Sequence, residues 1–145
     1  MQRKGMSLFE VVATLAIFGI LAGFAAIPLV NPAPKYRLLK AVREIHSRMN
    51  YARYKAICTG TKVRLRFDPD GFRTETWDEA NSQWISGPKE FIKGAAIEAN
   101  NTPTFHPVGT VSNLCTINIS NTWGHFKLSL AISGRIKITQ VDPPS

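Results

Sequence analysis

A long apolar stretch dominates the start of the chain. A short basic leader, residues 1–5, precedes it, and Glu10 is the only charged residue from Met6 to Val30. As a helix, residues 6–30 would reach about 37 Å, which exceeds a hydrocarbon core of roughly 30 Å. The pattern therefore predicts a transmembrane helix over 6–30. Because a carboxylate in hydrocarbon costs roughly 2.5–3.5 kcal/mol or more, Glu10 is a candidate functional residue.

Prolines separate this stretch from a second helical pattern. Residues 31–34 read Asn-Pro-Ala-Pro, and proline interrupts a helix unless it lies in the first turn. Asn31 as N-cap and Pro32 as first helical residue would restart the helix. An amphipathic helix is then predicted over 35–58, ending at Thr59-Gly60. Its apolar stripe has a spacing of three to four residues: Leu38, Val42, Ile45, Met49, Ala52 and Ala56.

After Gly60 the apolar period changes to two, which is typical of half-buried strands. Asp68-Pro-Asp-Gly71 is a strong turn signal between the first two predicted strands, and Gly87-Pro88 is expected to end the third. Residues 86–103 give no clear pattern. Strands are predicted at 62–67, 72–77, 83–85, 104–109 (a short strand into a turn), 114–120, 126–130 and 136–138.

The order of these elements predicts an α+β fold. A hydrophobic transmembrane helix continues, with proline breaks, into an amphipathic helix packed on an antiparallel β-sheet head. With 145 residues, one domain plus the membrane segment is expected. The predicted organisation is a leader over 1–5, the membrane helix over 6–30 and a head over 31–145, which is β-rich over 61–140.

Charge is distributed unevenly along the chain. The formal net charge is +8, and Lys and Arg concentrate between Lys35 and Arg66, where Glu44 is the only acid. Such a basic region suits anionic lipid, nucleic acid, an acidic neighbouring subunit or a solvated surface.

The sequence offers no set of residues for catalysis. His46, His106 and His125 are far apart in sequence, and no nucleophile–base, HExxH or phosphate-loop motif occurs. No catalytic residue, metal site or cofactor is therefore predicted. A membrane-anchored periplasmic enzyme remains only a remote alternative.

Two cysteines, Cys58 and Cys115, leave two alternatives. Cys115 shares the inward strand face with Ile117 and Ile119, and that face should meet the helix that ends near Cys58. A disulfide between them is one expectation, and two buried free thiols are the other.

The N-terminal residues resemble a known processing signal. Gly5, then Met6-Ser-Leu-Phe-Glu10 and an apolar helix, resembles the class III signal of type IV pilins and type II secretion pseudopilins. The resemblance implies that a prepilin peptidase cleaves between Gly5 and Met6 and methylates the new amine of Met6. It also implies that Glu10 pairs with the N-terminal amine of a neighbouring subunit. An opposite charge is the natural partner for a carboxylate in hydrocarbon.

The rest of the chain resembles the GspH/FimT-type minor pseudopilins. The resemblance rests on short motifs in a shared order: Ala52-Arg53, Ala56-Ile57, the basic strand 62–67, residues 105–109 and Ser133-Gly-Arg-Ile136. It implies a non-enzymatic subunit near the tip of a type II secretion pseudopilus or a type IV pilus. Its partners would be other pilins, the prepilin peptidase and the bacterial inner membrane, crossed once with the head in the periplasm. The signal is common to both systems, so the choice between them stays open.

The last predicted hairpin has a register that follows from its apolar residues. Leu128 and Leu130 can share a face with Ile136 and Ile138 only if the loop has an odd length. A three-residue loop over 132–134 pairs Leu130 with Ile136 and Leu128 with Ile138, with Gly134 in the left-handed conformation.

This register predicts a cationic outer face and a second functional candidate. Lys127, Arg135 and Lys137 then lie together, where they suit phosphate contacts or simply water. Gly134-Arg135-Ile136-Lys137 also resembles the basic Gly-Arg motif with which some FimT-type subunits bind DNA during natural transformation. A DNA-binding minor pilin is therefore the alternative function.

Overall fold

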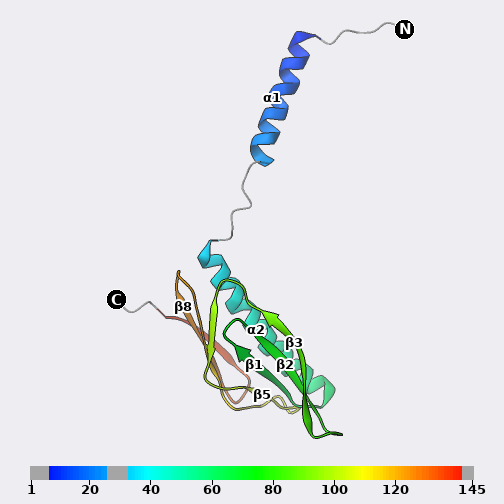
Figure 1. Cartoon of the computed structure of the whole chain (residues 1–145), viewed down its shortest axis with the longest axis vertical. Coiled ribbons are helices and arrows are strands. Elements are labelled where there is room, and N and C mark those ends of the chain that lie inside the picture. The colour runs from blue at the N-terminus through cyan, green and yellow to red at the C-terminus, as the bar shows by residue number, and fades with distance from the viewer. Residues whose placement is uncertain (1–6, 26–32, 142–145) are drawn as a thin grey trace, which may run out of the picture. The chain divides into compact units, whose positions relative to one another are not determined.

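The computed structural model describes residues 7–25 and 33–141. The chain divides into two compact units, residues 1–32 and 33–145. The first contributes helix α1 (Leu8–Ala25), and the second contributes helix α2 (Pro34–Thr59) and the strands β1 to β9. Figure 1 shows the strands lying against α2 in the second unit, which is called the head below.

Helix α1 is apolar on all sides except at Glu10 in its first turn. Its first backbone bonds run from the amides of Glu10 and Val11 to the carbonyl of Ser7, at 2.9 and 3.2 Å. Phe9 and Phe18 are 81% and 68% exposed, so this surface has no partner among the described residues. The predicted span over 6–30 includes Met6 and residues 26–30, which lie outside the described residues.

None of the helices in the described ranges, 7–25 and 33–141, has both the length and the apolar character needed to cross a membrane.

Helix α2 agrees with its predicted boundaries within one residue at each end. Ala33 is the N-cap, with φ −47° and ψ 146°, and Pro34 occupies the first turn, where its missing N–H costs nothing. Gly60 ends the helix in the left-handed conformation, with φ 67°. The predicted cap at Asn31 and Pro32 lies outside the described residues.

The predicted apolar stripe of α2 is confirmed as the centre of the core. All six predicted residues are buried, and Ala41 joins them. The stripe contacts β1 and β5 of one sheet and β7 of the other. Burial of this face, rather than helix propensity alone, holds α2 on the sheets.

The strands form two antiparallel sheets. The first has the order β3-β2-β1-β5-β6 and the second β4-β7-β8-β9. In chain order the strands are β1 (Val63–Asp68), β2 (Gly71–Asp78), β3 (Gln83–Phe91), β4 (Ala96–Ala99), β5 (Thr104–Phe105), β6 (Val111–Ser112), β7 (Thr116–Ser120), β8 (His125–Leu130) and β9 (Ile136–Val141). The α+β prediction is confirmed, whereas β4 and β6 were not predicted.

The expected break at Gly87-Pro88 is wrong, because β3 continues through it to Phe91. β3 is an edge strand, and its register with β2 shifts between Arg73 and Glu75. An irregular point on an edge strand tolerates a residue without an N–H.

The outer face of the first sheet carries a polar cluster. Glu75 on β2 is only 5% exposed, forms an ion pair with Arg64 on β1 and accepts a hydrogen bond from Ser86 on β3 at 3.2 Å. The Arg64 guanidinium lies 4.2 Å from the centre of the Trp84 ring. These contacts join three neighbouring strands on the side away from α2.

Candidate functional site

Glu10 lies in the first turn of α1 and is exposed. The hydroxyl of Thr14 donates a hydrogen bond to the backbone carbonyl of Glu10. This contact does not involve the Glu10 carboxylate. Within residues 7–25 and 33–141, Glu10 forms no ion pair. An unpaired carboxylate on an otherwise apolar helix is suited to a cation supplied from outside the chain. Gly5 and Met6, the predicted cleavage site, lie outside the described residues.

The β8–β9 hairpin has the register predicted from its apolar residues. Leu130 pairs with Ile136, and Leu128 pairs with Ile138. Gly134 has φ +79°, its amide donates to the Ala131 carbonyl at 2.9 Å, and the Ala131 amide donates to the Arg135 carbonyl at 2.9 Å. These bonds close a three-residue loop over 132–134.

One detail of the hairpin differs from the prediction. Leu128 and Leu130 are buried and Ile136 packs against the core, but Ile138 is 42% exposed. β9 is the last strand of its sheet, so no further strand covers this part of it.

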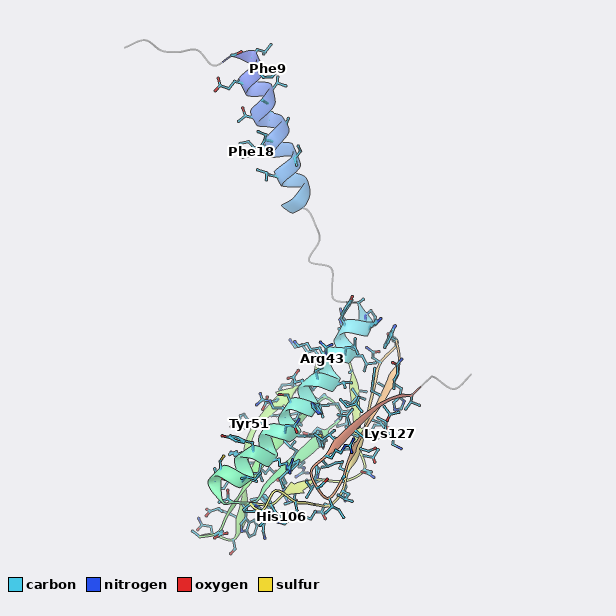
Figure 2. All side chains as sticks on the ribbon, turned by 180° about the vertical axis from the view of Figure 1, so that it is seen from behind. Phe9, Phe18, Arg43, Tyr51, His106 and Lys127 are labelled. Carbon is cyan, nitrogen blue, oxygen red and sulfur yellow. The ribbon has the colours of Figure 1, made fainter. Side chains whose placement is uncertain are left out.

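The three predicted cations are all exposed on the outer face of the hairpin. Lys127 pairs with Thr139 and Ser129 with Lys137, so both lysines alternate with the inward-facing apolar residues. Arg135 occupies the first position after the loop. No Asp or Glu occurs between His125 and Val141, so the positive charge of this face has no counterpart within the hairpin. Figure 2 labels Lys127 on this side of the head.

The Arg53 side chain lies beside the loop of this hairpin and bonds to a neighbouring turn, a placement that the helical spacing did not predict. Its Nε donates to the Gly109 carbonyl at 2.9 Å, in the turn between β5 and β6. A Cβ added to Gly134 would lie 2.6 Å from the same Nε. The Arg53 side chain therefore fills the space between two left-handed glycines. Two signals in the sequence pointed to Arg53: its position beside the buried stripe, and the Ala52-Arg53 motif of the family resemblance.

The two cysteines are free thiols, so the disulfide alternative is not realised. Cys58 is exposed near the end of α2, which differs from the expected burial. Cys115 is buried, as predicted, and its thiol donates to the Asn101 carbonyl at 3.1 Å. Burial raises the pKa of the Cys115 thiol. The two cysteines thus lie in different environments, one open to solvent and one inside the core.

The histidines are distributed over separate parts of the head. Nε2 of His106 lies 2.8 Å from Ser112 Oγ, whereas His46 is half-buried on α2, and His125 begins β8 (Figure 2 labels His106). In the described part of the chain, no three His, Cys, Asp or Glu side chains are grouped so that they could hold a metal ion.

Known proteins match both parts of the chain. The family described as the prokaryotic N-terminal methylation motif matches residues 1–26. Type II secretion system protein H of Xanthomonas campestris pv. campestris is 34% identical over 74 residues, which cover 51% of this chain and 44% of that protein. The matched segment thus spans less than half of this relative's length.

Solved structures match the head. The minor pseudopilin EpsH from the type 2 secretion system of Vibrio cholerae superposes with a TM-score of 0.58 at 12% identity, over 70% of this chain and 94% of EpsH. The resemblance to the GspH/FimT-type minor pseudopilins is confirmed. The type IV minor pilin FimU of Pseudomonas aeruginosa gives a TM-score of 0.57 at 21% identity, over 72% of this chain and 90% of FimU. At these identities, the structural similarity establishes the minor-pseudopilin fold.

Proposed function

We propose that the chain is a minor pseudopilin or minor pilin subunit and acts by assembly rather than by catalysis. The supporting observation is a methylation motif over residues 1–26 in the same chain as a head with the fold of EpsH and FimU. The filament would be a type II secretion pseudopilus or a type IV pilus, with this subunit near the tip. Before assembly, the apolar segment would hold the chain in the bacterial inner membrane, with the head in the periplasm.

The proposed processing supplies a partner for Glu10, which has no ion pair among the described residues. Cleavage between Gly5 and Met6 by the prepilin peptidase would leave Met6 as a methylated N-terminal amine. A protonated amine and a carboxylate are both unfavourable in hydrocarbon when alone, and each relieves the other as a pair. The pair would form between neighbouring subunits, so it would favour assembly over the isolated membrane form.

Co-assembly of variants at Glu10 tests this proposal. Glu10→Gln keeps the shape of the side chain and removes its charge, so membrane insertion should persist while recovery with other pseudopilins falls severalfold. Glu10→Asp is the matched control, because it keeps the charge on a shorter side chain and should retain more assembly than Glu10→Gln. The experiment is co-purification from membranes that contain the other subunits. Equal recovery of Glu10→Gln and wild type would refute the pairing role.

A second candidate function is DNA binding, and the exposed cations Lys127, Arg135 and Lys137 favour it. The contacts would be to phosphates, so affinity should be independent of DNA sequence and should fall steeply with salt. Arg135→Ala with Lys137→Ala should reduce the salt slope by about two contacts. Lys40→Ala with Arg43→Ala, which removes exposed cations from α2, is the control. Unchanged DNA binding by the hairpin variant would exclude this surface.

A further inference from the structure

Strand β9 forms an edge of the second sheet. β9 pairs with β8 and, among the described residues, with no other strand. It is six residues long, contains no proline, and its residues from Lys137 to Val141 are exposed. An edge strand of this kind presents unpaired N–H and C=O groups to which another strand can bind.

The hydrogen-bond pattern identifies the backbone groups that face outward. Ala131 and Arg135 form a bonded pair, and in an antiparallel ladder bonded and non-bonded pairs alternate. Leu130 confirms the alternation, because its amide donates to the Cys115 carbonyl on the other side, at 3.0 Å, and not to Ile136. Ile136, Ile138 and Gln140 therefore direct their amides and carbonyls away from β8. These three residues are called the open edge below.

The side chains around the open edge define the chemistry of a partner. A groove of about 690 Å³ lies here, and its lining includes Arg135, Ile136, Lys137 and Ile138. The apolar row continues from the core through Ile136 to Ile138, which is 42% exposed. On the opposite face Arg135 and Lys137 are exposed, and the hairpin contains no carboxylate.

We propose that the open edge binds an extended segment of another protein by strand addition, and that this segment alternates acidic and apolar residues. Its backbone would bond to Ile136, Ile138 and Gln140. Its apolar side chains would cover Ile138 and extend the inner row. Its carboxylates would face Arg135 and Lys137 on the outer side. This inference goes beyond filament assembly and does not depend on it.

Two other occupants would fit this edge less well. A second copy of β9 would bring its own Arg135 and Lys137 to a face that is already positive, which is unfavourable. Duplex DNA would satisfy the cations, but it would leave the three backbone amides and the exposed Ile138 without partners. An acidic strand satisfies the cations, the amides and the apolar row together.

Amide hydrogen exchange on the full chain in detergent micelles tests the proposal. The probe is a short peptide of alternating glutamate and valine, with a peptide of the same composition in scrambled order as control. The alternating peptide should slow exchange at Ile136, Ile138 and Gln140. The amides of Lys137 and Thr139 should change little, because they already bond to β8. Absence of slowing at the three outward amides at low salt would overturn the proposal.

Two variations separate backbone pairing from charge attraction. Methylating the peptide amides that would bond to the open edge should weaken binding roughly two- to tenfold for each blocked bond. This change leaves the protein intact. Ile138→Pro removes an outward amide without removing a bond to β8, whereas Ile138→Thr keeps that amide. The proline variant should bind the peptide more weakly than the threonine variant. In the peptide experiment, equal binding by the methylated and unmethylated peptides would contradict strand addition.

The same experiment distinguishes the other occupants. If duplex DNA shifts the resonances of Lys127, Arg135 and Lys137 while the peptide leaves the outward amides unchanged, the surface binds nucleic acid and the proposal fails. If the outward amides are already protected without peptide, and their protection rises with protein concentration, the occupant is a second copy and the proposal also fails.

Discussion

Replacing Gly134 by alanine should destabilise the head through two separate effects. Gly134 has φ +79°, and left-handed backbone costs a residue with a Cβ about 1–2 kcal/mol. The new Cβ would also lie 2.6 Å from Arg53 Nε and 2.8 Å from its Cδ. The same Nε donates to the Gly109 carbonyl at 2.9 Å, so a shift of Arg53 away from the new Cβ would disturb that bond. A hydrogen bond from a charged donor contributes about 1.5–3 kcal/mol.

The expected loss follows from these terms. Alanine restricts the unfolded chain and recovers about 0.4–1 kcal/mol, so the net destabilisation by Gly134→Ala should be roughly 2–4 kcal/mol. Gly60→Ala is the matched control, because Gly60 also has positive φ, +67°, but a Cβ there would meet nothing within 4 Å. It should cost about 1 kcal/mol.

A double-mutant cycle with Arg53→Ala isolates the contact. The free energy of unfolding is measured by urea titration with circular dichroism for wild type, both single variants and the double variant. In the Arg53→Ala background, Gly134→Ala should cost no more than Gly60→Ala does in wild type. If Gly134→Ala costs the same with and without Arg53, the side chain does not set the requirement for glycine, and the reasoning is wrong.

Three further predictions follow from other contacts. Glu75→Ala should destabilise the head by roughly 1–3 kcal/mol in urea titration, because it leaves Arg64 without its carboxylate; a change near zero would show that the cluster contributes nothing. The hydrogen bond from Lys89 lowers the pKa of Asp70, so this pair stabilises the fold above the pKa of unfolded aspartate and loses its effect as pH falls through the lower folded value. The stability difference between wild type and Asp70→Asn should therefore be present at neutral pH and disappear in acid; a difference independent of pH would contradict the pair. N-ethylmaleimide should label the exposed cysteine of the native protein rapidly and Cys115 only after denaturation, as measured by mass spectrometry; rapid native labelling of both would contradict burial.

Elements in which apolar residues recur at a regular spacing could be predicted from the sequence. The six-residue stripe of α2 predicted the core face of the helix. Residues buried along one face of a helix recur every three to four positions and are apolar, so the pattern is visible in the sequence. The β8–β9 register was predicted because a one-residue slip would have turned Leu128 and Leu130 to solvent. Gly134 followed from the loop length that this register requires.

Other features depend on neighbours that the sequence pattern does not reveal. β3 continues through Pro88 because it is an edge strand with an irregular register, and edge position is a property of the whole sheet. The two-residue strand β6 is too short to show a period. Cys58 and Cys115 lie near suitable elements, but disulfide formation requires positions that only the folded chain fixes.

The mass of the N-terminal segment, taken from protein assembled in the native host's membranes, tests the central claim most directly. If the chain is a pilin-like subunit, the protein should begin at Met6, lack residues 1–5 and carry one added methyl group on its N-terminal amine. Replacing Gly5 by leucine should leave the leader attached and prevent methylation. Assembled wild-type protein that still begins at Met1, or that begins at Met6 without the methyl group, would contradict the account.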